Sequence, residues 1–178
     1  MDKKHQQWLE AKRETSLIVD KLGLPVDKDI ADTVTVLRLL GFKTTGSCSG
    51  HVLRNTSGPY VVFESPRAIR YAALANRVEN PSLDQAYKRF RKKAIYYSAL
   101  EQQKLIIYLD AFYRDRPLDY PHHLLIQSMP LTYNSLKCQG AEAAVAAPRK
   151  ERKEILAKNQ AEMKAFTEYL KQQYFAER

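Results

Sequence analysis

Apolar residues return every three or four positions along five stretches of the chain, a spacing that buries one side of a helix. The predicted helices cover residues 3–22, 28–40, 66–78, 83–114 and 149–178. Gly23 and Gly41 follow the first two helices, where a left-handed residue commonly ends a helix. Asp27 precedes the second helix, so its carboxylate is predicted to cap the free backbone amides there.

Short runs of β-branched and aromatic residues predict strands between these helices. They cover residues 42–45, 51–53, 59–64, 123–129 and 132–138. The last two form a predicted hairpin that turns at Pro130 and Leu131, and the small, alanine-rich residues 139–148 are predicted to be a mobile loop.

Helices and strands do not alternate regularly, which favours an α+β fold with a small mixed or antiparallel sheet flanked by long helices. We expect one domain over residues 1–178. Its parts are a motif-bearing segment (1–65), a basic helical segment (66–116) and a strand pair with the terminal helix (117–178).

Composition is that of a globular chain, with 44% hydrophobic and 28% charged residues. No apolar run approaches the roughly 20 residues that span a bilayer. Residues 1–7 are polar and lack the apolar centre of a signal peptide. We therefore expect a cytoplasmic protein with no membrane partner, whose two cysteines, Cys48 and Cys138, are reduced thiols.

Positive charge is concentrated in the middle of the chain. The whole sequence carries a net charge of +9, and residues 65–104 hold nine basic residues against three acidic ones, a net +6. This excess indicates RNA or another polyanion as a partner, and it does not identify a protein partner. The alternative is a solvated helix face. The candidate phosphate-binding residues are Arg67, Arg70, Lys88, Arg89, Arg91 and Lys92.

Residues 44–51 read T-T-G-S-C-S-G-H and concentrate most of the candidate chemistry. Positive φ angles at Gly46 and Gly50 would curl the backbone so that successive amides face a phosphate or carboxylate. His51 and Cys48 are the candidate catalytic residues. The ligand-binding candidates are Thr44, Thr45, Ser47, Ser49 and Gly50. The alternative is a tight turn with a purely structural role.

Cys48 and His51 leave three chemical interpretations open. They could ligate zinc together with Cys138 and either His122 or His123, but this spacing is far weaker than paired CxxC motifs, so no metal site is predicted. Cys48 could be a nucleophile activated by His51, although no orienting Asn or Asp can be assigned from the sequence. Cys48 could also be buried and inert.

The segment from residue 8 to residue 51 resembles the wybutosine-synthesis (tRNA) methyltransferase family. That family's signature reads approximately V-D-x-D-I, a helix, then T-T/S-S-C-S-G-R. The matching residues are Val26, Asp27, Asp29, Ile30, Thr44, Thr45, Ser47, Cys48, Ser49 and Gly50. Gly46 stands where the family has Ser or Thr, and His51 stands where it has Arg. With His51 at its end, the turn is more similar to the S-C-x-G-H turn of uncharacterised bacterial proteins.

The resemblance implies that the S-C-S-G residues border a pocket for S-adenosylmethionine or for a modified guanosine. Two hypotheses follow for the whole chain. The first is a protein that acts on RNA or a nucleotide, with a ligand-binding turn and a basic helix that holds phosphates. The second is a non-catalytic binding module whose turn is structural.

Overall fold

The computed structural model describes residues 2–19, 23–52, 58–78, 85–117, 119–129 and 132–176. Its helices are α1 (Lys3–Ser16), α2 (Lys28–Leu39), α3 (Pro66–Ala75), α4 (Gln85–Tyr113) and α5 (Arg149–Ala176). Its strands are β1 (Lys43–Cys48), β2 (Tyr60–Glu64), β3 (Leu124–Ser128) and β4 (Tyr133–Cys138). The predicted α+β class is confirmed.

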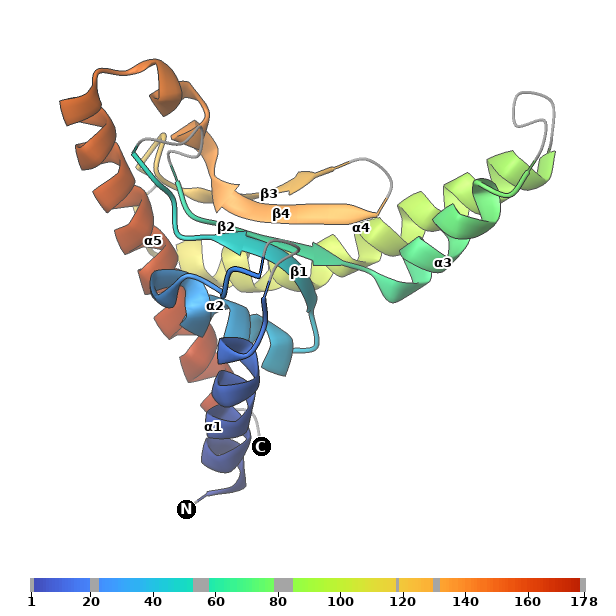
Figure 1. Ribbon diagram of the computed structural model, residues 1–178, viewed down its shortest axis with the longest axis horizontal. Helices are drawn as coiled ribbons and strands as arrows, with labels where there is room; N and C mark the ends of the chain where they lie inside the picture. The colour runs from blue at the N-terminus through green and yellow to red at the C-terminus, as the bar shows by residue number, and fades with distance from the viewer. Residues whose placement is uncertain are drawn as a thin grey trace.

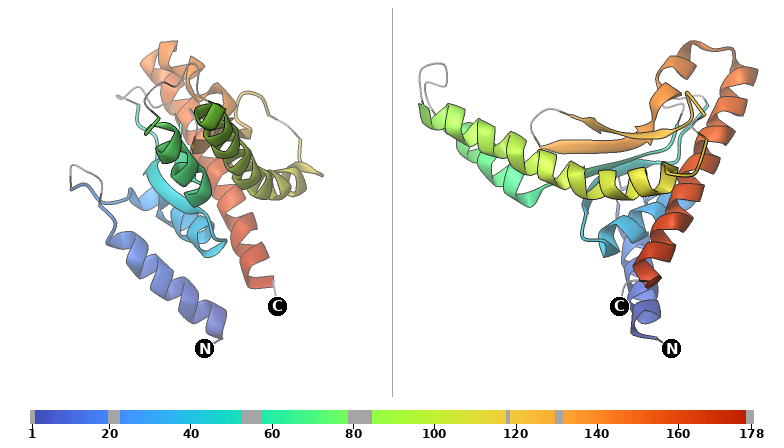
Figure 2. Two further views of the ribbon diagram at one scale, coloured as in Figure 1. Left: turned by 90° about the vertical axis from the view of Figure 1, so that its right-hand side faces the viewer. Right: turned by 180° about the vertical axis from the view of Figure 1, so that it is seen from behind.

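The four strands form one antiparallel sheet in the order β1-β2-β4-β3. Helix α4 runs beneath the sheet, and α5 crosses one end of it (Figure 1). The view from behind in Figure 2 shows the same arrangement, with the start of α1 near the end of α5. Helix α2 packs against both β1 and α5, so the start of the chain is held against its end.

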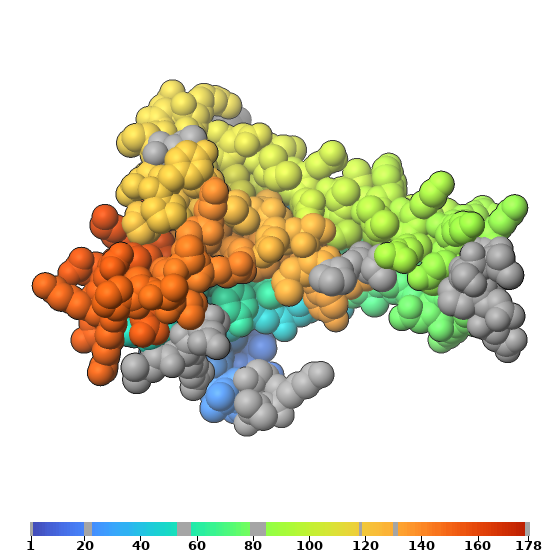
Figure 3. All heavy atoms as spheres, turned by 90° about the horizontal axis from the view of Figure 1, so that it is seen from above, coloured from blue at the N-terminus to red at the C-terminus, as the bar shows by residue number. Residues whose placement is uncertain are grey.

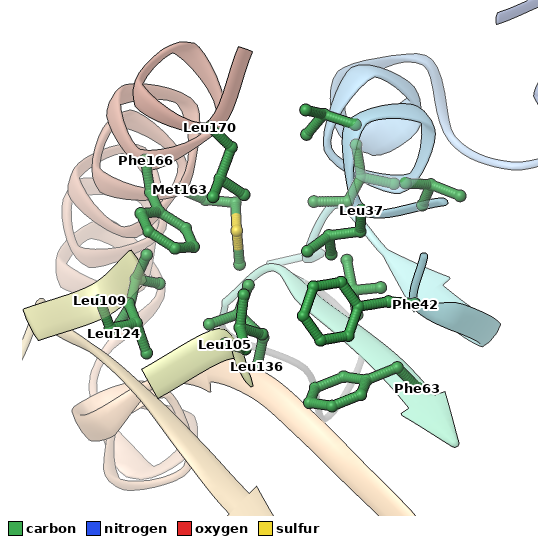
Figure 4. Packing of buried hydrophobic residues seen from close by; sticks show 14 of the residues in the cluster. Leu37, Phe42, Phe63, Leu105, Leu109, Leu124, Leu136, Met163, Phe166 and Leu170 are labelled. Atoms are coloured by element: carbon green, nitrogen blue, oxygen red, sulfur yellow. The ribbon is translucent and has the colours of Figure 1, made fainter. Parts of the chain in front are cut away.

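Large apolar side chains from the sheet and from α2, α4 and α5 meet in a single cluster (Figure 4). Phe63 of β2, Leu136 of β4 and Phe166 of α5 are each 0% exposed. Phe42, just after α2, meets Phe63 edge to face with ring centroids 5.4 Å apart. Side chains far apart in the sequence therefore share one core, which fixes β1 relative to α2.

Helices α3 and α4 form a hairpin that extends away from this core (Figures 1 and 3). Pro66 begins α3, and the Ser65 side chain caps it by accepting a hydrogen bond from the Ala68 amide. The Tyr71 and Tyr97 rings stack between the two helices, with centroids 5.5 Å apart and planes 4° from parallel. Tyr97 is half-buried, so its ring packs within the protein.

Several predicted boundaries are wrong. Helix α1 ends at Ser16 and not at residue 22. The next residue, Leu17, is 72% exposed, so a further helical turn would lack an apolar contact with the core to stabilise it. Helix α3 ends at Ala75, before the predicted residue 78. Residues 139–148 are not simply a loop, since they contain two short 3₁₀ helices, Gln139–Ala141 and Ala143–Ala146, whose small side chains allow close packing.

The predicted strand at residues 51–53 is reduced to one bridge position at His51; its last residue, like the Pro130-Leu131 turn, lies outside the described residues. Within the described ranges, no helix combines the length and the apolar character needed to cross a membrane.

Candidate functional site

The segment predicted to be a Gly/Ser turn is mostly an edge strand. Residues up to Cys48 belong to β1 and pair with β2, with an irregular register between Thr44 and Gly46. Of Gly46 and Gly50, Gly50 alone has a positive φ, at 85°, and Gly46 is opposite Val62 in the strand pair. The predicted double-glycine curl is therefore wrong, because pairing with β2 extends the backbone through Gly46.

Asp27 holds the end of this strand. It occupies the N-cap position of α2, as predicted, but its side chain makes no capping hydrogen bond. Asp27 Oδ2 instead accepts hydrogen bonds from the Ser49 amide, at 2.9 Å, and from Ser49 Oγ, at 3.0 Å. The Gly50 amide donates to Cys48 Sγ at 3.3 Å. The Ser49 and Gly50 amides therefore donate to acceptors within the chain, and not to an external anion as predicted.

Asp27, Cys48 and His51 form a compact cluster at this point. One potential ligand atom from each residue lies within 4.8 Å of the others. His51 Nε2 is 3.6 Å from Asp27 Oδ2, with the two side chains 35% and 38% exposed, while Cys48 is buried. The acidic partner of His51 that sequence reasoning did not assign is therefore Asp27, which it had interpreted as a helix cap.

The cluster borders a cavity of about 290 Å³ between β1 and the segment before α2. Apolar side chains form part of its wall, including Ile18, Leu24, Val26 and Val34. Its polar lining contains five of the residues predicted from the sequence: Thr44, Thr45, Ser47, Cys48 and His51. Ser49 and Gly50, the other two, are buried and do not line it.

Tyr60 also lines the cavity and was missed from the sequence. It is opposite Cys48 in the β1–β2 register. Burial raises the pKa of its hydroxyl, and the neighbouring Cys48 and Asp27 raise this pKa further. Only the pairing of β2 with β1 brings Tyr60 here, and no local sequence signal indicates this pairing.

The predicted phosphate-binding residues lie elsewhere, on the α3–α4 hairpin. All six are exposed, and none forms an ion pair with a carboxylate that the structure describes. Strand β2 begins at Tyr60, beside Cys48, and ends at Glu64, which leads into α3. The Asp27–Cys48–His51 cluster and the hairpin therefore lie toward opposite ends of β2, and none of the predicted phosphate-binding residues lines the cavity.

Cys138 and His122 form a separate buried group around Asn159, whereas the half-buried His123 contacts the rings of Tyr113 and Tyr120. His122 Nδ1 and Asn159 Oδ1 are 2.7 Å apart, and Cys138 Sγ donates to the Asn159 carbonyl at 3.6 Å. Burial raises the pKa of Cys138 to about 12, so its thiol is protonated. Among the described residues, the cluster of metal-binding side chains around Cys48 contains none of Cys138, His122 and His123. The four-residue zinc set considered from the sequence does not form.

Comparison of the chain with protein-family models, with curated protein sequences and with solved structures gives no match. The resemblance to the wybutosine-synthesis methyltransferases, and the S-adenosylmethionine that it implies, stay predictions.

Proposed function

We propose that this protein binds RNA through the basic face of the α3–α4 hairpin. The observation that carries the proposal is the absence of neutralising charge there. Residues 66–78 and 85–100 contain eight Lys and Arg residues and no Asp or Glu. A projecting surface of one charge sign attracts a polyanion and releases its condensed counterions on binding.

The aromatic residues of the hairpin support the cations in position. The Arg67 guanidinium lies 5.4 Å from the centre of the Tyr97 ring, and the Lys93 ammonium lies 4.9 Å from the centre of the Tyr71 ring. These rings also stack on each other, so they are occupied within the protein. Lys and Arg side chains contact the phosphate backbone and do not read the bases. We therefore expect RNA affinity with little sequence preference.

RNA is favoured over other polyanions by the resemblance to a tRNA-modifying family. A cytoplasmic location, where RNA is abundant, fits this proposal. Methyl transfer would require the cavity beside Cys48, and RNA binding by the hairpin does not depend on it. A non-catalytic RNA-binding module is therefore as compatible with the proposal as an enzyme.

The test is fluorescence anisotropy with a labelled single-stranded RNA over a series of salt concentrations. A hairpin variant carries Lys88→Gln, Arg89→Gln and Lys92→Gln. A control variant carries Arg149→Gln, Lys150→Gln and Lys153→Gln, which removes the same charge from exposed positions at the start of α5.

Losing three phosphate contacts should make the slope of log K against log salt concentration shallower by about 2. The hairpin variant should show this change together with weaker binding, and the control variant should behave like the wild type. No binding by the wild type at about 50 mM salt, where the electrostatic contribution is large, would refute the proposal. Equal losses in the two variants would also refute it, because they would show a general effect of net charge.

A further inference from the structure

Three side chains that commonly bind transition metals converge where β1 ends: the Asp27 carboxylate, the Cys48 thiol and the His51 imidazole. A tetrahedral zinc ion with ligands at about 2.0–2.3 Å keeps neighbouring ligand atoms about 3.3–3.8 Å apart. The 3.6 Å between His51 Nε2 and Asp27 Oδ2 falls within this range. All three ligand atoms lie within 4.8 Å of one another, so small side-chain rotations would complete the geometry.

We propose that Asp27, Cys48 and His51 bind a divalent transition metal, with zinc as the best fit. One sulfur, one nitrogen and one oxygen ligand suit zinc, whereas calcium and magnesium prefer oxygen ligands alone. Three protein ligands beside an open cavity leave a fourth position for water or another small ligand, as in catalytic zinc sites.

The surroundings of the cluster already orient two of the three ligands. Ser49 donates two hydrogen bonds to Asp27 Oδ2, which fixes the carboxylate as the outer hydrogen bonds of metal sites do. The Gly50 amide donates to Cys48 Sγ at 3.3 Å and so holds the sulfur in place at the end of β1. These hydrogen bonds connect the start of α2 to the end of β1 and hold ligands from the two segments together.

The metal site goes beyond the proposed RNA binding and is tested without RNA. Untagged protein is stripped with a chelator, dialysed, and titrated with Zn²⁺ by calorimetry and with Co²⁺ by absorbance. We expect one metal ion per chain. The Co²⁺ complex should show a thiolate charge-transfer band in the near ultraviolet and the visible bands of tetrahedral coordination.

Cys48→Ser should abolish the charge-transfer band, and His51→Ala should lower the affinity for Zn²⁺ by more than Ser49→Ala does. Ser49→Ala removes one of the two hydrogen bonds that orient Asp27, so it should weaken Zn²⁺ binding about 10- to 100-fold and keep the band. The matched controls are Cys138→Ser and His5→Ala, which alter the other cysteine and an exposed histidine of α1. Both controls should retain the affinity and the spectrum.

Circular dichroism checks the fold of each variant. The half-exposed His51 tolerates truncation better than buried Cys48, so His51→Ala keeps the test decisive if Cys48→Ser does not fold. Wild-type protein that binds Zn²⁺ no better than His51→Ala would overturn the proposal. Loss of the charge-transfer band in Cys138→Ser but not in Cys48→Ser would overturn it as well. Either failure would leave the hairpin measurements unchanged, which separates this inference from RNA binding.

Discussion

Substitution of Gly50 by alanine tests whether the end of β1 is packed as closely as the structure indicates. Gly50 has a φ of 85°, and a Cβ atom there would lie 2.6 Å from Leu156 Cδ1 and 2.9 Å from the carbonyl carbon of Gly58. The leucine methyl group can rotate away, but the Gly58 backbone cannot. Gly41 provides a matched control, because its φ is 87° and nothing lies within 4 Å of the same Cβ position.

The two variants share one cost and differ in a second. A left-handed conformation costs an L-residue about 1–2 kcal/mol, which applies at both positions. Forcing an extra methyl group into a packed site adds about 1–3 kcal/mol, which applies only at Gly50. Gly50→Ala should therefore lower the free energy of unfolding by about 2–5 kcal/mol, and Gly41→Ala by about 1–2 kcal/mol. The entropy that alanine removes from the unfolded chain is the same in both variants and cancels in their difference.

Urea denaturation followed by circular dichroism measures both free energies of unfolding, with the slope m compared to confirm that the unfolded state is unchanged. A difference below about 1 kcal/mol between the two variants would refute the close packing of Gly50, since the overpacking cost would then be missing. In that case backbone strain alone would explain the losses at both positions.

Two further predictions concern the start of β3. The Leu124 amide donates a 2.7 Å hydrogen bond to the Tyr113 hydroxyl, so Tyr113→Phe should lower the free energy of unfolding by about 1–3 kcal/mol in urea denaturation, and an unchanged value would contradict this. Burial lowers the pKa of His123, so the unfolded chain takes up a proton at this residue at higher pH than the folded protein. The free energy of unfolding should therefore fall as the pH drops below about 6.5, and His123→Gln should make this fall smaller in urea titrations at several pH values.

Elements with strong local signals could be predicted from the sequence. The apolar spacing of α5 and the β-branched residues of β2 gave their positions to within a few residues, and Asp27 and Gly41 bracketed α2 correctly. Helix α1 was predicted too long, because an apolar residue such as Leu17 continues a helical pattern whether or not another element packs against it.

The site was only partly predictable, since its contacts join residues distant in the sequence. The cluster of Thr, Ser, Cys and His residues indicated where the cavity lies. The hydrogen bonds between Asp27 and Ser49 span 22 positions, and a helix cap was the simpler local interpretation of the aspartate. The separation of the Asp27–Cys48–His51 cluster from the basic residues follows from the direction of β2, which no local pattern encodes.

The two candidate sites differ in how firmly the core holds them. Asp27 directly precedes α2, whose Val36 and Leu37 are fully buried, and Cys48 ends a strand paired with β2, whose Val61 is equally buried. Ligands fixed by packed elements keep the spacing that a metal ion requires. The cations of the hairpin stand outside this core on exposed helix faces, where side chains can follow an irregular phosphate backbone. Packed elements thus hold ligands of the proposed metal site, and exposed, adaptable charges form the proposed RNA-binding surface.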